Sequence, residues 1–124
     1  MSAEDLAFAR QFLDTLAAAA ESGDLEDVYP LLDPDVHWMT PQRDLRGTDE
    51  VAALFSWYSP DEIRHEVEFD IQSVTDLGGG KIAADFQELY RTKQTGELAY
   101  TRDRQIVLTI REGKIASYEM RFAG

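Results

Sequence analysis

The sequence of 124 residues contains no cysteine. That absence excludes disulfides, zinc–thiolate sites, iron–sulfur clusters and catalytic thiols. Basic residues are also few, with 12 Lys and Arg against 24 Asp and Glu, which gives a net charge of −12. Such an acidic chain repels the phosphates of nucleic acids and of anionic membranes, so we expect neither a nucleic acid nor a membrane as a partner.

Signals for export or membrane insertion are lacking as well. The first eight residues carry acids where a signal peptide carries Lys or Arg. The uncharged stretch Thr15 to Ala20 is far too short to span a bilayer. We therefore expect a cytoplasmic protein.

The composition is that of a globular domain. Hydrophobic residues make up 44% of the chain and charged residues 29%, a mixture that supports one buried core rather than a disordered chain. A length of 124 residues suits one domain and is too short for two ordinary ones. We expect a single domain over residues 1–124.

Three helices are predicted in the first half of the chain. Leu, Ala and Phe side chains recur at three- and four-residue steps through the first segment, which Gly23 ends. Asp24 provides an N-cap for the second segment, where Pro30 predicts a short or partly 3₁₀ helix. Thr48 provides an N-cap for the third segment. The predicted helices cover residues 6–22, 25–32 and 48–58.

Most of the second half alternates between apolar and polar residues, as β-strands do. The glycine run at 78–80 and the segments 94–97 and 112–113 predict hairpin turns. Residues 33–35 are predicted as a turn and 41–47 as a loop, on either side of a short strand. Helices followed by an antiparallel meander predict an α+β fold in which the helices cover the apolar face of one curved sheet. The predicted strands cover residues 36–40, 65–73, 81–93, 98–111 and 114–122.

A carboxylate interrupts one apolar face of the predicted sheet. Glu88 lies between Phe86 and Tyr90 in the inward-facing series of its strand. A buried carboxylate is costly unless it is protonated, paired or facing a cavity. Arg102 and Arg104 continue the inward face of the neighbouring strand, so we expect Glu88 to contact one of them. Whether Glu88 is a pocket acid or the partner in a purely structural ion pair stays open on the sequence alone.

Two other polar residues lie near the apolar face: His65 opens an inward-facing series, and Thr40 ends the first strand. The two His residues of the chain lack the spacing of a metal site, so no metal is expected. Neither a serine-nucleophile elbow nor a dinucleotide-binding fingerprint is present, so no cofactor is expected. A hydrophobic cavity with a few acid–base and cationic groups remains, which suits binding of a small apolar molecule or proton transfer on it.

The order of several short motifs resembles a known family. The motifs are SGDLEDV at 22–28, LLDPDVHW at 31–38, RGTDEVAALF at 46–55 and REGKIASY at 111–118. Together they resemble the SnoaL-like and ketosteroid-isomerase-like branch of the nuclear-transport-factor-2-like (NTF2-like) superfamily. The resemblance implies a cystatin-like cone, in which a strongly curved antiparallel or mixed half-barrel wraps a long helix and leaves a pocket at its open mouth. It also implies a homodimer formed through the convex face of the sheet.

The catalytic residues of this family are largely replaced at the matching positions. Thr40 stands where ketosteroid isomerases carry a general-base Asp before a Pro, and Phe12 stands near their oxyanion-binding Tyr. Met120 aligns with the acid that SnoaL cyclases and limonene-epoxide hydrolase carry in the last strand. Epoxide hydrolases also use an Arg and an Asp on one inward strand face, and Glu88 alone keeps an acid there. The resemblance therefore implies the fold and a pocket rather than one of these reactions.

We expect a pocket for a small apolar molecule, with Glu88 as a general acid or base. Arg104 would orient this carboxylate or stabilise a developing oxyanion, and His65 is the third catalytic candidate. The expected activity is that of a cofactor-independent isomerase, cyclase, dehydratase or hydrolase. The alternative is a non-catalytic module of the same fold that binds a ligand or a protein. The expected lining residues are Trp38, Thr40, Trp57, Tyr58, Phe86, Tyr90, Arg102, Tyr118 and Met120.

Overall fold

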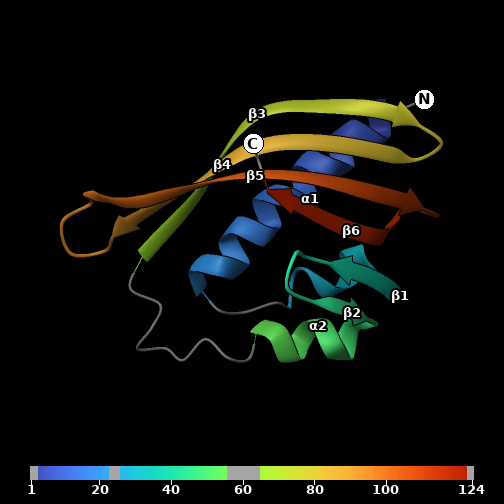
Figure 1. Ribbon diagram of the computed structural model, residues 1–124, viewed down its shortest axis with the longest axis horizontal. Helices are drawn as coiled ribbons and strands as arrows, with labels where there is room; N and C mark the ends of the chain where they lie inside the picture. The colour runs from blue at the N-terminus through green and yellow to red at the C-terminus, as the bar shows by residue number, and fades with distance from the viewer. Residues whose placement is uncertain (1–2, 23–25, 56–64, 123–124) are drawn as a thin grey trace.

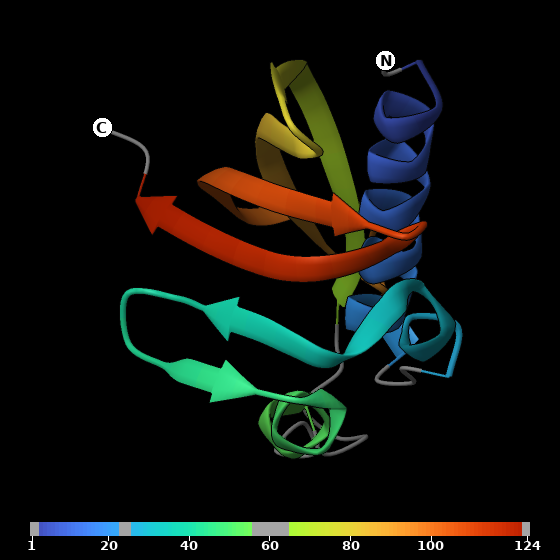
Figure 2. The same ribbon diagram turned by 90° about the vertical axis from the view of Figure 1, so that its right-hand side faces the viewer.

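The computed structural model describes residues 3–22, 26–55 and 65–122. Within these residues six strands form one open, curved sheet in the order β2-β1-β6-β5-β4-β3, and the helix α1 lies across its concave side (Figures 1 and 2). Neighbouring strands are antiparallel except β1 and β6, which run parallel. The α+β fold predicted from the sequence is confirmed. Its elements are α1 (Ala3–Ser22), the 3₁₀ turn η1 (Tyr29–Leu31), β1 (Leu32–Met39), β2 (Asp44–Arg46), α2 (Thr48–Phe55), β3 (His65–Gly78), β4 (Lys81–Thr92), β5 (Leu98–Arg111) and β6 (Lys114–Phe122).

The long helix α1 buries one side against the sheet. Its buried positions recur at three- and four-residue steps, with mostly exposed side chains between them. Glu4 and Asp5 lie in the first turn, where the positive end of the helix dipole favours acids. The helix packs mainly on β3 and also contacts β4. Its buried residues are Ala9, Phe12, Leu13, Leu16, Ala17 and Ala19.

The predicted second helix is wrong. In the described part of this segment the chain forms only the 3₁₀ turn η1, and Leu32 already begins β1. An α-helix beginning at residue 25 would place Pro30 in its interior, where the ring lacks a backbone donor and clashes with the preceding turn. The described residues therefore contain two α-helices where three were predicted. The predicted end of the third helix, residues 56–58, lies outside the described residues. Of the described helices, none is long and apolar enough to cross a membrane.

The region before α2 also differs from the prediction. β1 covers Leu32–Met39, so the predicted turn at 33–35 lies within the strand. The register of β1 with β6 shifts in this region, where the Asp35 N–H donates to Asp33 Oδ1 at 2.8 Å. These turn-forming residues therefore make a local irregularity in the strand instead of ending it. The predicted loop at 41–47 contains the short strand β2, which extends the sheet beside β1.

The predicted antiparallel meander of β3, β4, β5 and β6 is confirmed. β5 and β6 have the predicted bounds, and β4 ends one residue early, at Thr92. β3 continues to Gly78, beyond its predicted end at Ser73. The register of β3 with β4 shifts between Ile71 and Ser73, and pairing then resumes. A bulge of this kind lets a strand continue after its alternation is interrupted.

An aromatic cluster joins α1 to the sheet. Trp38 of β1 stacks on Tyr118 of β6, with ring centroids 3.9 Å apart and ring planes 9° apart. Phe12 of α1 meets both rings edge-on, at centroid distances of 6.4 and 6.2 Å. All three side chains are buried. The cluster therefore ties α1 to the parallel pair β1 and β6, the part of the sheet that the meander alone does not hold.

We predict that Gly80→Ala destabilises the fold more than Gly79→Ala. Both glycines have positive φ angles, 82° and 63°, and a side chain in this region costs about 1–2 kcal/mol. At Gly80 the added Cβ would also lie 2.5 Å from the backbone oxygen of Ile110, whereas at Gly79 nothing lies within 4 Å. In denaturant unfolding we expect Gly79→Ala to lose about 1 kcal/mol and Gly80→Ala at least about 2 kcal/mol. Equal losses would contradict the close approach at Gly80.

Candidate functional site

The candidate site surrounds Glu88 on the inner face of the sheet, the face turned toward α1. Among the described residues, Glu88 is the one charged residue that is buried, with 7% of its surface exposed. Burial alternates without interruption along β4 from Ile82 to Glu88. The carboxylate therefore shares its face with the hydrophobic core. The inward placement of Glu88 predicted from the sequence is confirmed.

Arg104 and Tyr90 hold one oxygen of this carboxylate. Arg104 Nε lies 3.2 Å from Glu88 Oε1, and the Tyr90 hydroxyl donates to the same oxygen at 2.9 Å. Across the β4–β5 ladder Glu88 faces Arg102, and Arg104 faces Phe86. Arg104 therefore reaches Glu88 diagonally, as long side chains do across a sheet. Both bonds end on Oε1, so they leave Oε2 for another partner.

Arg102 lies over two tyrosines instead of pairing with Glu88. The rings of Tyr90 and Tyr100 stack, with centroids 4.4 Å apart and planes 16° apart. The guanidinium carbon of Arg102 lies 5.4 Å from the centre of the Tyr100 ring and 5.8 Å from that of Tyr90. A cation within about 6 Å of an aromatic face is attracted to it. The sequence predicted an ion pair of Glu88 with one of two arginines, and the structure selects Arg104.

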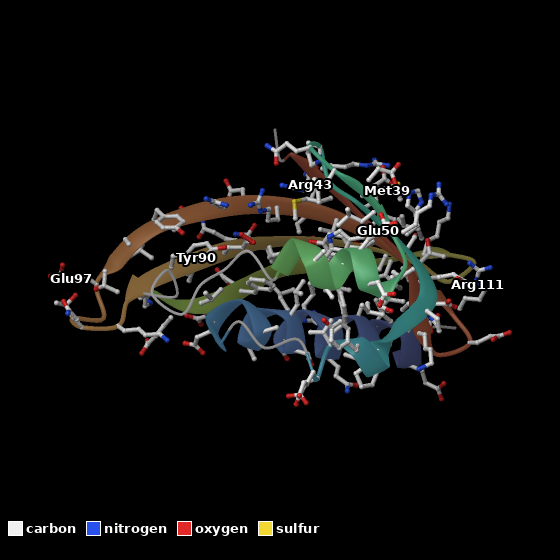
Figure 3. The ribbon with its side chains drawn as sticks, turned by 90° about the horizontal axis from the view of Figure 1, so that it is seen from below. Met39, Arg43, Glu50, Tyr90, Glu97 and Arg111 are labelled. Atoms are coloured by element: carbon white, nitrogen blue, oxygen red, sulfur yellow. The ribbon has the colours of Figure 1, made fainter. Side chains whose placement is uncertain are left out.

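Two phenols near Glu88 are held in their protonated form. Burial raises the pKa of the Tyr118 hydroxyl well above its usual range, and the negative charge of Glu88 raises it further. Burial also raises the pKa of Tyr90, and the charge of Glu88 and the hydrogen bond to it add to the effect. Both hydroxyls therefore keep their protons at neutral pH. Tyr90 lies toward the Glu97 end of the β4–β5 hairpin, away from the Arg111 end of the sheet (Figure 3).

Several of the predicted lining residues are part of the hydrophobic core on the inner face of the sheet, the same face as Glu88. Trp38 and Tyr118 are the stacked pair of the aromatic cluster. Phe86 is buried and stacks on Phe69, with centroids 4.7 Å apart. Met120 is half-buried on β6, where it pairs with an inner-face position of β5. These side chains form the apolar wall of the site.

Other predicted site residues are not brought to Glu88 by the described structure. Thr40 is half-buried in the β1–β2 turn, where its hydroxyl accepts hydrogen bonds from the N–H groups of Gln42 and Arg43. His65 begins β3, and its side chain lies outside the described part of the chain. Trp57 and Tyr58 also lie outside the described residues. The roles predicted for these residues stay predictions.

Sequence reasoning missed Tyr100 as a member of the site. Its ring stacks on Tyr90 and lies under the guanidinium of Arg102. The signal was present, because Tyr100 precedes Arg102 by two positions and so shares its face of the strand. Its direct ladder partner is Tyr90, which identifies the stacking pair once the register is known.

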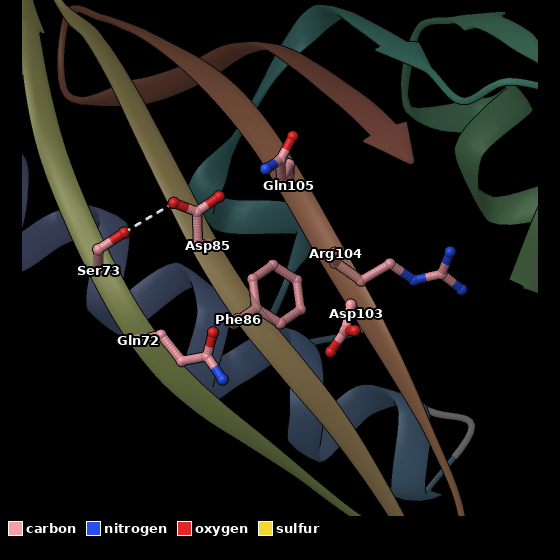
Figure 4. A pocket seen from close by; sticks show the side chains of 7 residues that line it. All are labelled: Gln72, Ser73, Asp85, Phe86, Asp103, Arg104 and Gln105. Atoms are coloured by element: carbon pink, nitrogen blue, oxygen red, sulfur yellow. Dashed lines mark hydrogen bonds between the residues drawn. The ribbon is translucent and has the colours of Figure 1, made fainter. Parts of the chain in front are cut away.

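A polar hollow of about 450 Å³ lies on the outer face of the sheet, away from α1 (Figure 4). The Ser73 hydroxyl donates to Asp85 at 2.8 Å at its edge. Its polar lining differs from the apolar pocket that the sequence predicted. In the described part of the chain no three His, Asp or Glu side chains are grouped to hold a metal ion. The residues around the hollow are Gln72, Ser73, Asp85, Asp103 and Gln105, and it is also bordered by Phe86 and Arg104, whose side chains belong to the inner-face series of β4 and β5.

We predict that Arg104→Met destabilises the protein by about 3 kcal/mol, because it leaves the buried Glu88 carboxylate without its cation. Removing both charges in Glu88→Gln/Arg104→Met should recover at least about 1 kcal/mol. Urea unfolding of the single and double variants measures both quantities. Arg121→Met provides the control, because the Arg121–Glu119 pair is exposed and should contribute less than about 1 kcal/mol. A double variant less stable than Arg104→Met would contradict this account of the pair.

We predict that Tyr118→Phe reduces the loss of stability at alkaline pH. The pKa of Tyr118 is higher in the folded protein than in the unfolded chain. Above about pH 10 the unfolded chain therefore loses this proton first, and the free energy of unfolding falls as pH rises. Phenylalanine has no such proton and keeps a ring against Trp38. Urea unfolding from about pH 8 to about pH 11 measures the slope, and an unchanged slope in the variant would contradict the prediction.

Comparisons with known proteins bear on the fold. The sequence matches the SnoaL-like domain family over residues 9–118. No curated protein matches it.

Three solved structures illustrate the likeness. An NTF2-like protein from Anabaena variabilis is 18% identical, with a TM-score of 0.74, over 100% of this chain and 93% of that one. An NTF2-like protein of unknown function from Burkholderia pseudomallei is 23% identical, with a TM-score of 0.70, over 99% and 92%. A hypothetical protein with a ketosteroid isomerase-like fold from Catenulispora acidiphila, in complex with trimethylamine, is 12% identical, with a TM-score of 0.66, over 90% and 85%. At these identities the likeness shows the fold alone.

The family match runs from α1 into β6 and so includes most of the described sheet. The structural neighbours extend over nearly the whole chain. The resemblance carried by the order of the sequence motifs is thereby confirmed. The chain belongs to the SnoaL-like domain family and shares its fold with NTF2-like proteins.

Proposed function

We propose that the inner face around Glu88 binds a small, mostly apolar molecule and that Glu88 acts on it as a general acid or base. One observation carries the proposal. The buried charge of the described residues is a carboxylate held at a single oxygen by two donors, Arg104 and Tyr90. The inner-face side chains beside it are apolar or aromatic, namely Phe69, Phe86, Tyr118 and Met120.

These groups suit proton transfer on a small molecule. A carboxylate that acts as a base accepts a proton from the substrate. The bonds from Arg104 and Tyr90 both end on Oε1 of Glu88, so Oε2 is the oxygen proposed to accept this proton. The Nη groups of Arg104, which the bond from Nε to Glu88 does not use, can stabilise the oxyanion that forms when a proton leaves a carbon beside a carbonyl. Isomerisation, cyclisation, dehydration and hydrolysis can each use such a set without a cofactor.

The family assignment supports a ligand-binding site on this fold. SnoaL-like and related NTF2-like domains include isomerases, cyclases, dehydratases and binding modules. The similar protein from Catenulispora acidiphila was solved in complex with a small amine. Neither fact names a substrate for this chain, so the proposal depends on the groups around Glu88.

The second candidate function is a non-catalytic module that binds its ligand on the same face. Phe12, near the position of the oxyanion-binding Tyr of ketosteroid isomerases, is fully buried and packs on Trp38 and Tyr118. The first helix therefore offers no hydroxyl at that position. In this alternative the Glu88–Arg104 pair orients a ligand without transferring a proton. The two candidates share the binding site and differ only in turnover.

The homodimer implied by the family resemblance stays a prediction. Val107 and Thr109 are half-buried on the outer face of β5, the face through which such a dimer would form. Asp103 lies on the same face, so a partner copy would have to present a donor or a cation to it.

We predict that small apolar molecules stabilise the protein when they bind this face. The panel would contain steroids, aromatic polyketides, terpene epoxides and enones. A ligand at about 100 times its dissociation constant adds about 2.7 kcal/mol, which raises the melting temperature by several degrees. Absence of any shift in a cooperatively melting protein would contradict the proposed binding site.

For a ligand that is also turned over, Glu88→Gln should lower turnover about 10²–10⁴-fold while the ligand still raises the melting temperature. Glu119→Gln is the matched control, because Glu119 is a carboxylate on the outer face of β6, paired with Arg121. It should leave turnover unchanged. Full activity in Glu88→Gln would remove Glu88 from the mechanism. Stabilisation without turnover of any ligand would favour the binding module.

A further inference from the structure

Two arginines lie on the inner face of β5. The described carboxylates on this face neutralise only one of the two positive charges. Arg102 and Arg104 lie two positions apart on the same face. Within the described residues, Glu88 pairs with Arg104, and no carboxylate pairs with Arg102. Asp103, between the two arginines, lies on the outer face and accepts a hydrogen bond from Gln87 at 3.1 Å. The inner face here therefore holds two cations and one anion.

This local excess is notable in a chain whose net charge is −12. Strand β3 lies beyond β4, and its first half places acids on the outer face and apolar side chains on the inner face. The half-buried inner positions nearest to Arg102 on this strand therefore carry no charge that could offset it. The exposed acids in the first half of β3 are Glu66, Glu68 and Asp70, and the half-buried residues that alternate with them are Val67, Phe69 and Ile71.

Both arginines also keep hydrogen-bond donors for another partner. Arg104 contacts Glu88 through Nε, and within the described residues its Nη groups make no hydrogen bond. The guanidinium carbon of Arg102 lies 5.8 and 5.4 Å from the ring centres of Tyr90 and Tyr100, and within the described residues no carboxylate takes up its N–H groups. The planar fork of N–H groups on an arginine matches a carboxylate in two-point geometry.

An aromatic surface lies beside these donors. Tyr100 is 40% exposed and stacks on Tyr90. Stacked aromatic rings attract a further ring beyond the area they bury. Arg102 lies against both tyrosines, so a ring and an anion would meet the protein at adjacent points.

Resting on the function proposed above, we infer that the small molecule is an aromatic carboxylate. Its carboxylate binds the Nη groups of Arg102 and Arg104, and its ring lies against Tyr100. Glu88 neutralises one of the two arginines on this face. The single negative charge of the ligand's carboxylate would neutralise the other. A phosphate dianion would exceed that charge and repel Glu88. Glu88 Oε2 then faces the body of the ligand rather than its charged end.

The test compares acids with neutral amides of the same shape. The full chain is titrated calorimetrically with 2-naphthoate and 2-naphthamide, and with 4-biphenylcarboxylate and its amide, at low ionic strength. We expect each acid to bind at least about tenfold more tightly than its amide. Added salt should weaken the binding of the acids and leave that of the amides unchanged.

Arg102→Gln should abolish the preference for the acid and leave the affinity for the amide unchanged. Arg102 is exposed, so the variant is expected to fold, and its melting curve checks this. The matched control is Arg121→Gln, which removes the same charge from the outer face of β6 and should keep the preference.

The outcomes separate this inference from the function on which it rests. Amides that bind as tightly as their acids would overturn the aromatic carboxylate and leave the binding site standing. A preference that survives in Arg102→Gln, or is lost equally in Arg121→Gln, would place the anion elsewhere and overturn the inference as well. If no acid, no amide and no neutral molecule of the earlier panel binds, the proposed function fails together with the inference.

Discussion

The stack of Trp38 on Tyr118, closed edge-on by Phe12, is the contact on which the arrangement of the fold depends. Hairpins join the strands from β3 to β6, but β1 reaches β6 through a parallel pairing between segments far apart in the sequence. Such a pairing needs side-chain packing to compensate for the loss of chain entropy when the loop closes. The three buried rings supply that packing and connect α1, which lies mainly on β3, to these two strands. They also position the Tyr118 ring, whose hydroxyl is near enough to Glu88 to respond to its charge.

The candidate site follows from the length of the β4–β5 hairpin. This hairpin extends beyond the end of α1 in Figure 1, so the inner face of each strand passes from a covered part to an open part. Along β5 the buried Leu108 and Ile106 lead to the half-buried Arg104 and then to the exposed Arg102. The alternation that builds the core thus continues into a polar cluster on the same face. The fold explains in this way why the cations stand beside the core without being enclosed by it.

Much of this arrangement could be predicted from the sequence because it depends on local alternation. The strands of the meander, and the contact of Glu88 with an arginine, follow from period-two patterning and from hairpin partnership. The choice between Arg104 and Arg102 could not be predicted, because it depends on the diagonal reach of Arg104 and on the attraction of Arg102 to Tyr100. The extent of β1 and the presence of β2 were missed because turn-forming residues are held there by long-range pairing with β6. The aromatic cluster was not predicted for the same reason.

The energetics of the Glu88–Arg104 pair bear on the function proposed for Glu88. Burying two charges costs desolvation energy that their attraction barely repays, and well-packed apolar residues often stabilise a core equally well. The surrounding positions show that this face accepts such residues, since Phe86 and Ile106 neighbour the pair and are fully packed. A chain selected for stability alone has no need of a carboxylate at position 88, where the pair fills only one of its two oxygens. The proposed function explains this position. Oε2 of Glu88 would accept a proton from the bound molecule, and the guanidinium of Arg102 would balance the negative charge of that molecule.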